Sequence, residues 1–204
     1  MAASPSLLIL ASTSRYRREL LSRLRLPYAV EAPGVDETPR PGEPPAALAQ
    51  RLALEKARAV AVRHPDSLVI GSDQVADLAG QPLGKPGSHA RAVEQLRRMS
   101  GQRVVFQTAL AVVRLDTGFE AVDLAAVTVT FRTLSDDEIQ TYLRLDEPYD
   151  CAGSARSESL GVALLTAIDS DDPTALVGLP LIRTCALLRA AGLDPLAIPS
   201  GLSA

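Results

Sequence analysis

The stretch Leu7-Leu-Ile-Leu-Ala11, followed directly by Ser12-Thr-Ser14, decides the fold class. A short, continuous apolar run is typical of a strand that is buried on both faces of a mainly parallel sheet. The hydroxyl residues after it are good helix N-caps, and the apolar spacing beyond them predicts a helix over Tyr16–Leu24. A buried strand that leads straight into a helix indicates an α/β protein.

Outward from this segment, strands and helices alternate in the first half of the chain, and a long antiparallel hairpin follows. We expect strands at Tyr28–Ala32, Leu68–Ile70, Val104–Val113, Ala121–Phe131 and Gly161–Ile168, a hairpin over Val75–Leu83, a proline-rich loop at Pro33–Pro45, and helices at Ala46–Arg63, Ser88–Met99, Ser135–Arg144 and Ala175–Ala191. The sequence therefore predicts an α/β fold with a mixed, twisted sheet and flanking helices, in a single domain over residues 1–204.

The composition excludes several classes of protein. With 47% hydrophobic and 22% charged residues, the chain is not expected to be disordered throughout. Its 21 basic and 24 acidic residues give a net charge of −3, which argues against a general nucleic-acid binder but permits a small anionic ligand. No apolar run approaches the roughly 20 residues that span a bilayer. We expect a soluble cytoplasmic protein with no membrane partner and with Cys151 and Cys185 reduced.

A cation at Arg17 occupies a place where an apolar residue is expected. It shares a helical stripe with three leucines, and it lies in the first turn, where a positive charge opposes the helix dipole. A bound phosphate would compensate, because the helix start supplies free N–H groups and Ser12 and Ser14 supply hydroxyls. The alternative is an arginine that reaches solvent or pairs with a nearby carboxylate.

Two lysines extend this pattern. Lys56 shares one face of the predicted helix with Leu48, Leu52 and Val60, at spacings of four residues that form an apolar column. A lysine in this apolar column must be paired with a carboxylate, reach solvent or face a cleft. A satisfied structural lysine near the helix edge is the equally weighted alternative. Lys85, in the turn Gly84-Lys85-Pro86, could neutralise a phosphate as a point charge.

Carboxylates are expected near these cations. Asp73 is predicted to follow the strand Leu68–Ile70, and ligands of open α/β sheets bind beyond the carboxyl ends of strands. It could act as a general base or metal ligand, or it could be a plain turn residue. Asp36-Glu37, in the proline-rich loop, could complete a site for a hard cation. The residues alone thus predict a cleft that binds a polyanion with a divalent cation.

Seven short motifs, taken in order, extend over nearly the whole chain. They are Leu-Ala-Ser-Thr-Ser-x-x-Arg-Arg at 10–18, Val35-Asp-Glu37, Glu55-Lys-Ala57, Gly71-Ser-Asp73, Gly84-Lys-Pro86, Ala152-Gly-Ser154 and Leu176-Val-Gly-Leu-Pro180. This ordered set resembles the Maf family of nucleotide pyrophosphatases. The resemblance implies two lobes around a central cleft, as in inosine-triphosphate pyrophosphatases, and hydrolysis of a nucleoside triphosphate to its monophosphate and pyrophosphate with a divalent cation, Mg²⁺ or Mn²⁺.

The resemblance also implies roles for individual residues. Asp73 matches the proton acceptor, and Glu37 and Asp73 would help to hold the cation. Phosphate-binding positions are matched by Ser12, Ser14, Arg17, Lys56 and Lys85. The substrate would be a small-molecule nucleotide, and a homodimer is expected only by analogy.

Three positions separate the branches of this family. Tyr16, Gln74 and Glu158 resemble the branch that acts on 7-methyl-GTP. An aromatic face attracts the positively charged methylated base, and a carboxylate accepts hydrogen bonds from guanine. Arg15, where the family usually has proline, Tyr16, where tryptophan is commoner, and Ser159, where a glycine is expected, depart from the pattern. The alternatives are a dTTP, UTP or modified-pyrimidine pyrophosphatase, and, in another class, a non-catalytic nucleotide sensor that regulates cell division.

Overall fold

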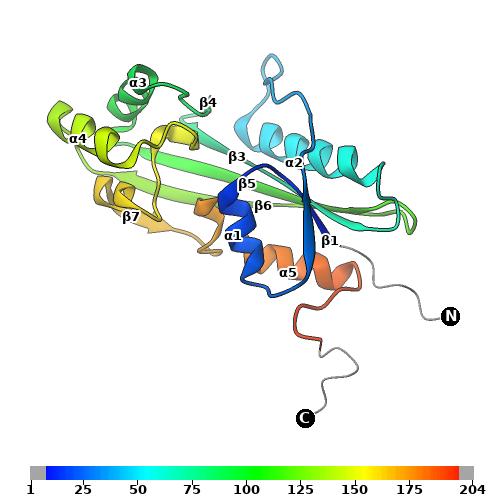
Figure 1. Ribbon diagram of the computed structural model, residues 1–204. Coiled ribbons are helices and arrows are strands. Elements are labelled where there is room, and N and C mark those ends of the chain that lie inside the picture. Colours follow the sequence, from blue (N-terminus) through cyan, green and yellow to red (C-terminus); the bar gives the residue numbers. More distant parts are fainter. Residues whose placement is uncertain (1–7, 198–204) are drawn as a thin grey trace, which may run out of the picture.

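One mixed sheet of seven strands forms the centre of the molecule in a computed structural model that describes residues 8–197. The strand order is β2-β1-β3-β5-β6-β7, with β4 paired to β3 (Figure 1). β1 runs parallel to β2 and β3, and the other pairs are antiparallel. The strands are β1 (Leu8–Ala11), β2 (Tyr28–Glu31), β3 (Leu68–Leu78), β4 (Gln81–Leu83), β5 (Arg103–Arg114), β6 (Phe119–Phe131) and β7 (Leu165–Asp169).

Five helices cover this sheet: α1 (Arg15–Ser22), α2 (Pro45–Ala61), α3 (His89–Met99), α4 (Asp136–Asp146) and α5 (Leu181–Ala190). In Figure 1, α2 lies over one face, α1 and α5 lie over the other, and α3 and α4 cover the far end. The predicted α/β class with a mixed sheet is confirmed. Within residues 8–197, no helix is long and apolar enough to cross a membrane.

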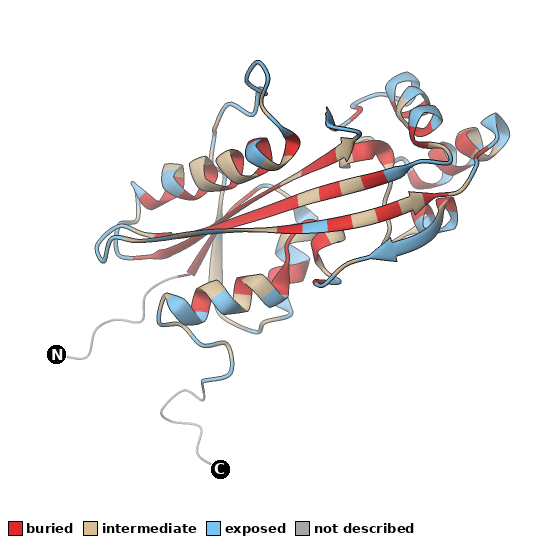
Figure 2. Ribbon diagram, turned by 180° about the vertical axis from the view of Figure 1, so that it is seen from behind, coloured by how far each residue is buried: buried red, intermediate tan, exposed pale blue. Residues whose placement is uncertain are grey.

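The core follows directly from the run that opens the chain. Ile9 packs in the cluster under α2, whereas Leu8 and Leu10 pack in the cluster under α1 and α5. Successive side chains of a strand point to opposite faces, so a strand with helices on both sides must be apolar at every position. A third cluster, which includes Phe106 and Phe131, joins the far end of the sheet to α3 and α4. Figure 2 shows the central strands buried and the outer helix faces and β7 exposed.

Glycine is needed where α2 crosses β3. A Cβ added to Gly71 would lie 2.6 Å from the backbone nitrogen of Ala57 and 3.0 Å from its Cβ. Only a residue without a side chain lets the helix approach the strand this closely. This close approach brings the side chains of α2 next to those that follow Gly71 in β3.

Most of the predicted elements are present, and serine side chains cap three of the helices. Ser14, Ser88 and Ser135 accept hydrogen bonds from backbone N–H groups in the first turns of α1, α3 and α4, and the cap expected among Ser12–Ser14 is confirmed. Ser135 and Glu138 form a complete capping box.

Three expected boundaries are wrong. The strand expected to end at Ile70 continues to Leu78. The reason is that β5 pairs with residues 69–77 and supplies hydrogen-bond partners for their backbone, including the polar residues that follow Gly71. The strand expected over Gly161–Ile168 begins only at Leu165, after a 3₁₀ turn over Leu160–Leu164. The helix expected over Ala175–Ala191 is a 3₁₀ turn, Ala175–Val177, and a separate α5, because Gly178 has a φ of 123° and Pro180 has extended backbone.

Candidate active site

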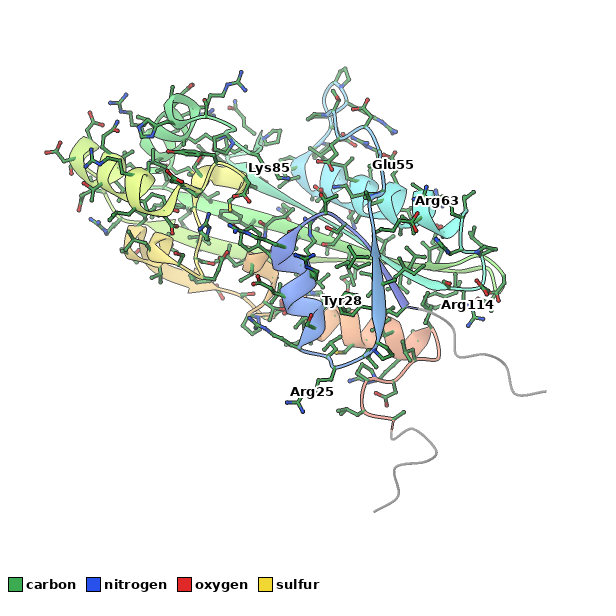
Figure 3. All side chains as sticks on the ribbon, in the orientation of Figure 1. Arg25, Tyr28, Glu55, Arg63, Lys85 and Arg114 are labelled. Carbon is green, nitrogen blue, oxygen red and sulfur yellow. The ribbon has the colours of Figure 1, made fainter. Side chains whose placement is uncertain are left out.

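Ten of the residues that the sequence analysis singled out line one cavity of about 670 Å³. They come from the β1–α1 turn, α1, the loop before α2, α2, β3, the turn after β4, and the segment before β7. Figure 3 shows Lys85 on the turn after β4, on the side where α2 begins. The set is Ser12, Ser14, Tyr16, Arg17, Glu37, Lys56, Asp73, Gln74, Lys85 and Glu158.

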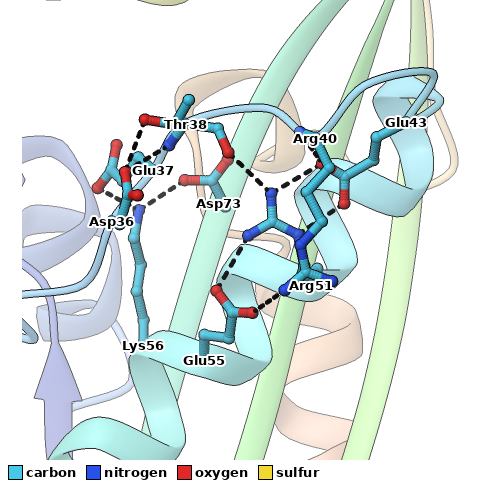
Figure 4. A network of polar contacts seen from close by, with 9 residues as sticks. All are labelled: Asp36, Glu37, Thr38, Arg40, Glu43, Arg51, Glu55, Lys56 and Asp73. Carbon is cyan, nitrogen blue, oxygen red and sulfur yellow. Dashed lines mark hydrogen bonds and ion pairs between the residues drawn. The ribbon is translucent and has the colours of Figure 1, made fainter.

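A buried ion-pair cluster forms the floor of the cavity. Lys56 Nζ lies 2.6 Å from Asp73 Oδ1 and 2.7 Å from Glu37 Oε1 (Figure 4). Lys56 is 4% exposed and Asp73 is 7% exposed, so both charges are largely removed from water. Charges this deep are tolerated when they are paired. The lysine in the apolar column of α2 therefore has carboxylate partners and also faces the cavity.

The position of Asp73 differs from the sequence prediction. It lies inside β3, opposite Ala109 of β5, and not in a turn beyond the strand. Neighbouring Ser72 projects to the other face of the sheet, where its hydroxyl donates to the carbonyls of Ala109 and Gly178. Pairing with β5 fixes the backbone of Asp73, and the carboxylate is consequently held on a rigid element.

The turn between β1 and α1 presents hydroxyl and N–H groups. Ser12 is buried, and its Oγ accepts a hydrogen bond from Ser14 N at 3.1 Å. Ser14 Oγ in turn accepts from Arg17 N at 3.4 Å, which caps the helix. This is the arrangement that favours an anion at a helix N-terminus.

Arg17 is held in the cavity by a backbone carbonyl. Its Nε donates to Gly178 O at 2.9 Å, and its terminal nitrogens have no partner within residues 8–197. Burial lowers the pKa of the Arg17 guanidinium, while the charges of Asp73 and Glu37 oppose that shift. Arginine nevertheless stays charged in proteins, so two N–H-bearing nitrogens are available to an anion.

Glu37 reaches the cluster from the loop before α2. Burial alone would raise its pKa, but the hydrogen bond from Lys56 and the charges of Lys56, Lys85 and Arg17 outweigh burial and hold the pKa of Glu37 below its usual value. Glu37 is therefore ionised at neutral pH. Asp36, named with it from the sequence, instead accepts from the backbone and hydroxyl of Thr38 and does not line the cavity.

An arginine that the sequence analysis overlooked fixes this loop. Arg51 of α2 donates to Glu43, Glu55 and the carbonyl of Thr38 (Figure 4). The loop is thus tied to the helix next to Glu37. The acidic residues four and eight positions from Arg51 are the signal in the sequence that could have revealed this network.

The residues present fit a divalent cation only in part. The described residues contain no group of three or more metal-ligating side chains. Asp73 and Glu37 each give one oxygen to Lys56, and their other oxygens have no partner within residues 8–197. Two carboxylate oxygens suit Mg²⁺ or Mn²⁺ when phosphate oxygens and water complete the coordination.

Tyr16 lies at the other side of the cavity. The Cζ atoms of Arg15 and Arg156 lie 4.7 Å and 5.8 Å from the centre of its ring. Its hydroxyl accepts from Arg15 at 2.6 Å and from the Cys151 thiol at 3.8 Å. The ring thus lies next to two planar cations, and its contact with a charged base stays a prediction.

The amide of Gln74 is held in one orientation. Its Nε2 donates to Thr108 Oγ1 and to the carbonyls of Ala175 and Leu176, at 2.9, 2.9 and 3.0 Å. Carbonyl oxygens only accept, so the nitrogen must face them, and Oε1 is left without a partner within residues 8–197. Thr108 is fully buried and was not predicted, because nothing in the sequence places it opposite Gln74.

Glu158 lines this cavity and a smaller neighbouring one. No ion pair holds its carboxylate within the described part of the chain. Partial burial raises the pKa of Glu158 above that of an ordinary glutamate, although the positive charge of Arg156 acts in the opposite direction. Tyr16, Gln74 and Glu158 are therefore brought into one cavity with the phosphate-binding candidates.

Comparison with known proteins finds a matching family and several similar proteins. The family described as "Maf-like protein" matches residues 7–191. A protein of Polaromonas sp. (strain JS666 / ATCC BAA-500) named 7-methyl-GTP pyrophosphatase is 70% identical over 91% of this chain and 84% of its own. Proteins with the same name from Albidiferax ferrireducens and Bordetella pertussis are 65% and 59% identical over 93% and 96% of this chain and 95% and 98% of their own.

Proposed function

The chain belongs to the Maf-like protein family, and from this premise we propose that it hydrolyses 7-methyl-GTP to 7-methyl-GMP and diphosphate. Relatives at 59–70% identity that carry the name 7-methyl-GTP pyrophosphatase support this substrate. We propose that the enzyme acts on the free nucleotide, in the cytoplasm.

The observation that carries the proposal is the cluster of Lys56, Asp73 and Glu37 in the floor of the cavity. Arg17 and Lys85 line the same cavity, so three cations face a volume that suits a nucleotide. A triphosphate brings about four negative charges, and buried cations bind such a ligand more strongly than exposed ones. We assign the phosphates to these cations and to the hydroxyls of Ser12 and Ser14.

In this proposal Asp73 is the proton acceptor. Lys56 holds Asp73 Oδ1, which leaves Oδ2 to receive a proton from the attacking water. As the new bond forms between the water oxygen and the α-phosphorus, the bond from that phosphorus to the α–β bridging oxygen breaks. Diphosphate leaves with the bridging oxygen, and Arg17 and Lys85 stabilise the charge that develops on it.

Glu37 would hold the divalent cation, Mg²⁺ or Mn²⁺, through the oxygen that Lys56 does not occupy. Asp73 would help to hold it through a bound water, which leaves Asp73 Oδ2 free to accept the proton. When bound, the cation supplies charge neutralisation and polarisation of phosphate oxygens. Glu37 is ionised at neutral pH, as this role requires.

Base recognition is assigned to Tyr16, Gln74 and Glu158. The ring of Tyr16 would stack on the positively charged methylated base. Gln74 Oε1 is free to accept a hydrogen bond from a guanine N–H, and so is the carboxylate of Glu158. A uracil or thymine has a single N–H between two carbonyls, and two acceptors would meet those carbonyls unfavourably.

The experiment is a measurement of pyrophosphate release from 7-methyl-GTP, GTP, dTTP, UTP and ITP with Mg²⁺ or Mn²⁺. The wild type is compared with Asp73→Asn, which keeps the shape of the side chain, and with the surface variant Asp136→Asn as control. We expect the wild type to release pyrophosphate fastest from 7-methyl-GTP. The kcat of Asp73→Asn should fall roughly 10²–10⁴-fold, and the kcat of the control should be unchanged.

The other outcomes identify the alternatives. If pyrophosphate is released fastest from dTTP or UTP, the substrate is a pyrimidine nucleotide. That result would refute the assignment of Tyr16, Gln74 and Glu158 to a methylated guanine. Tight binding of a triphosphate that survives incubation with metal would support the non-catalytic sensor. Near-full turnover by Asp73→Asn would refute the role of Asp73.

A further inference from the structure

The last turn of α4 contains a buried carboxylate that the proposed reaction does not use. Asp146 is 9% exposed and is not among the residues that line the cavity. Its Oδ1 accepts from Ser159 Oγ at 2.5 Å and lies 3.6 Å from Arg156 Nη1, and its Oδ2 has no partner within residues 8–197. Apolar side chains of similar volume that replace both partners of a buried ion pair commonly cause no loss of stability. Stability alone therefore does not account for a buried pair of Asp146 and Arg156 here.

The partners of Asp146 belong to the segment that carries Glu158. Arg156 and Ser159 stand on either side of Glu158, and both contact Asp146. Tyr142, one turn earlier in α4, accepts a hydrogen bond from Arg156 N at 3.1 Å. Ser159 N also donates to Arg156 O at 3.2 Å, so residues 156–159 form a tight turn held by α4 at both ends.

The same contacts extend to Tyr16. The Arg156 guanidinium that pairs with Asp146 lies 5.8 Å from the Tyr16 ring centre. Arg156 Nε is buried and has no partner within the described residues, and Arg156 Nη2 lies 3.8 Å from the exposed Asp150. Asp146, Tyr16 and Asp150 are thus the groups that fix this side chain. One carboxylate is thus linked to two of the three residues assigned to the base, without touching the cavity.

We propose that Asp146 is a positioning residue for base selectivity: it fixes the turn 156–159, and through it Glu158 and Arg156, against Tyr16. This inference rests on the proposed function, because it assigns Glu158 and Tyr16 to the base. Ser159 takes part in the same positioning, since its hydroxyl donates a hydrogen bond to Asp146 Oδ1.

The test uses Asp146→Asn and Ser159→Ala, with Asp136→Asn as the matched control. Asp136 is at the start of the same helix and pairs with Arg97 on the surface, far from the turn 156–159 in the chain. For each variant, kcat and KM are measured with 7-methyl-GTP and with UTP, and the melting temperature is recorded. We expect KM for 7-methyl-GTP to rise roughly tenfold in Asp146→Asn, with KM for UTP and both kcat values within about twofold.

A double variant separates positioning from a general structural role. If Asp146 acts through Glu158, then Asp146→Asn combined with Glu158→Gln loses no more selectivity than Glu158→Gln alone. Equal losses of kcat on both substrates with selectivity intact would overturn the inference. So would wild-type selectivity in Ser159→Ala, a variant that removes one hydroxyl and decides the matter even if Asp146→Asn does not fold.

Failure of the proposed function gives a different result. In that case the wild type itself shows no preference for 7-methyl-GTP. An intact preference in the wild type that persists in both variants refutes only the role of Asp146.

Discussion

Replacing Lys56 by methionine tests the ion-pair cluster most directly. Methionine keeps the length of the side chain but removes the ammonium that lies 2.6 Å from Asp73 and 2.7 Å from Glu37. Asp73 then loses its partner in a site where it is 7% exposed, whereas Glu37, with a side chain 54% exposed, can turn to water. Removing one partner of a buried pair costs about 3–5 kcal/mol, and we expect the lower end because methionine packs well in the apolar column of α2.

The assay is unfolding of wild type and Lys56→Met by heat and by urea at pH 7, followed by circular dichroism. A loss of about 3 kcal/mol corresponds to a fall in Tm of roughly 6–12 °C for a chain of this size. Arg58→Met, on the same helix, removes an exposed pair with Glu120 and should change the stability by less than about 1 kcal/mol. Pyrophosphate release should be lost in Lys56→Met and kept in Arg58→Met.

The pH dependence supplies the decisive check. Lys56 holds the pKa of Glu37 below its usual value, so this pair stabilises the fold above the ordinary glutamate pKa of about 4.3 and loses that effect as the pH falls through the lowered value. The difference between wild type and Lys56→Met should therefore be largest near pH 7 and shrink below about pH 4. A variant within about 1 kcal/mol of wild type at pH 7, or a difference independent of pH, would refute the coupling.

Three further predictions concern other parts of the molecule. Gly71→Ala should lower Tm, because overpacking costs about 1–3 kcal/mol and its Cβ would lie 2.6 Å from Ala57 N; an unchanged melting curve would contradict this. KM for 7-methyl-GTP should rise as the pH falls toward the raised pKa of Glu158, since protonation removes a hydrogen-bond acceptor for the base, and Glu158→Gln should flatten that profile. Thr108→Val should raise KM about 2–10-fold with kcat unchanged in steady-state assays, because Gln74 loses one acceptor.

The sequence was sufficient to predict most elements because their patterns are local. A continuous apolar run such as that in β1 and the capping box of Ser135 and Glu138 each depend on a few neighbouring residues. The end of β3 could not be predicted in this way. Its polar stretch around Asp73 is stabilised by pairing with β5, some 36 residues further along the chain, and no local pattern reports that partner.

The helix expected at the carboxyl end was wrong for a related reason. The segment has helix-forming residues on both sides of Gly178, but buried Asp172 binds the first N–H groups of α5 and fixes a separate loop before it. This loop supplies the carbonyls that hold Arg17 and Gln74. The candidate residues could thus be predicted, because several are charged side chains at positions where the pattern calls for apolar ones. The backbone groups that orient them could be identified only from the tertiary structure.

The three long strands have a mechanical consequence. β3, β5 and β6 run unbroken through the sheet, and each contributes residues to the clusters at both of its ends. Bending these paired strands would break several interstrand hydrogen bonds at once. We therefore expect the two ends of the sheet not to move as bodies about a hinge. Any movement over a nucleotide then falls to the turn at Lys85, because Arg51 ties the loop before α2 to that helix and α4 holds the turn 156–159. We expect the radius of gyration in X-ray scattering to stay constant when nucleotide binds.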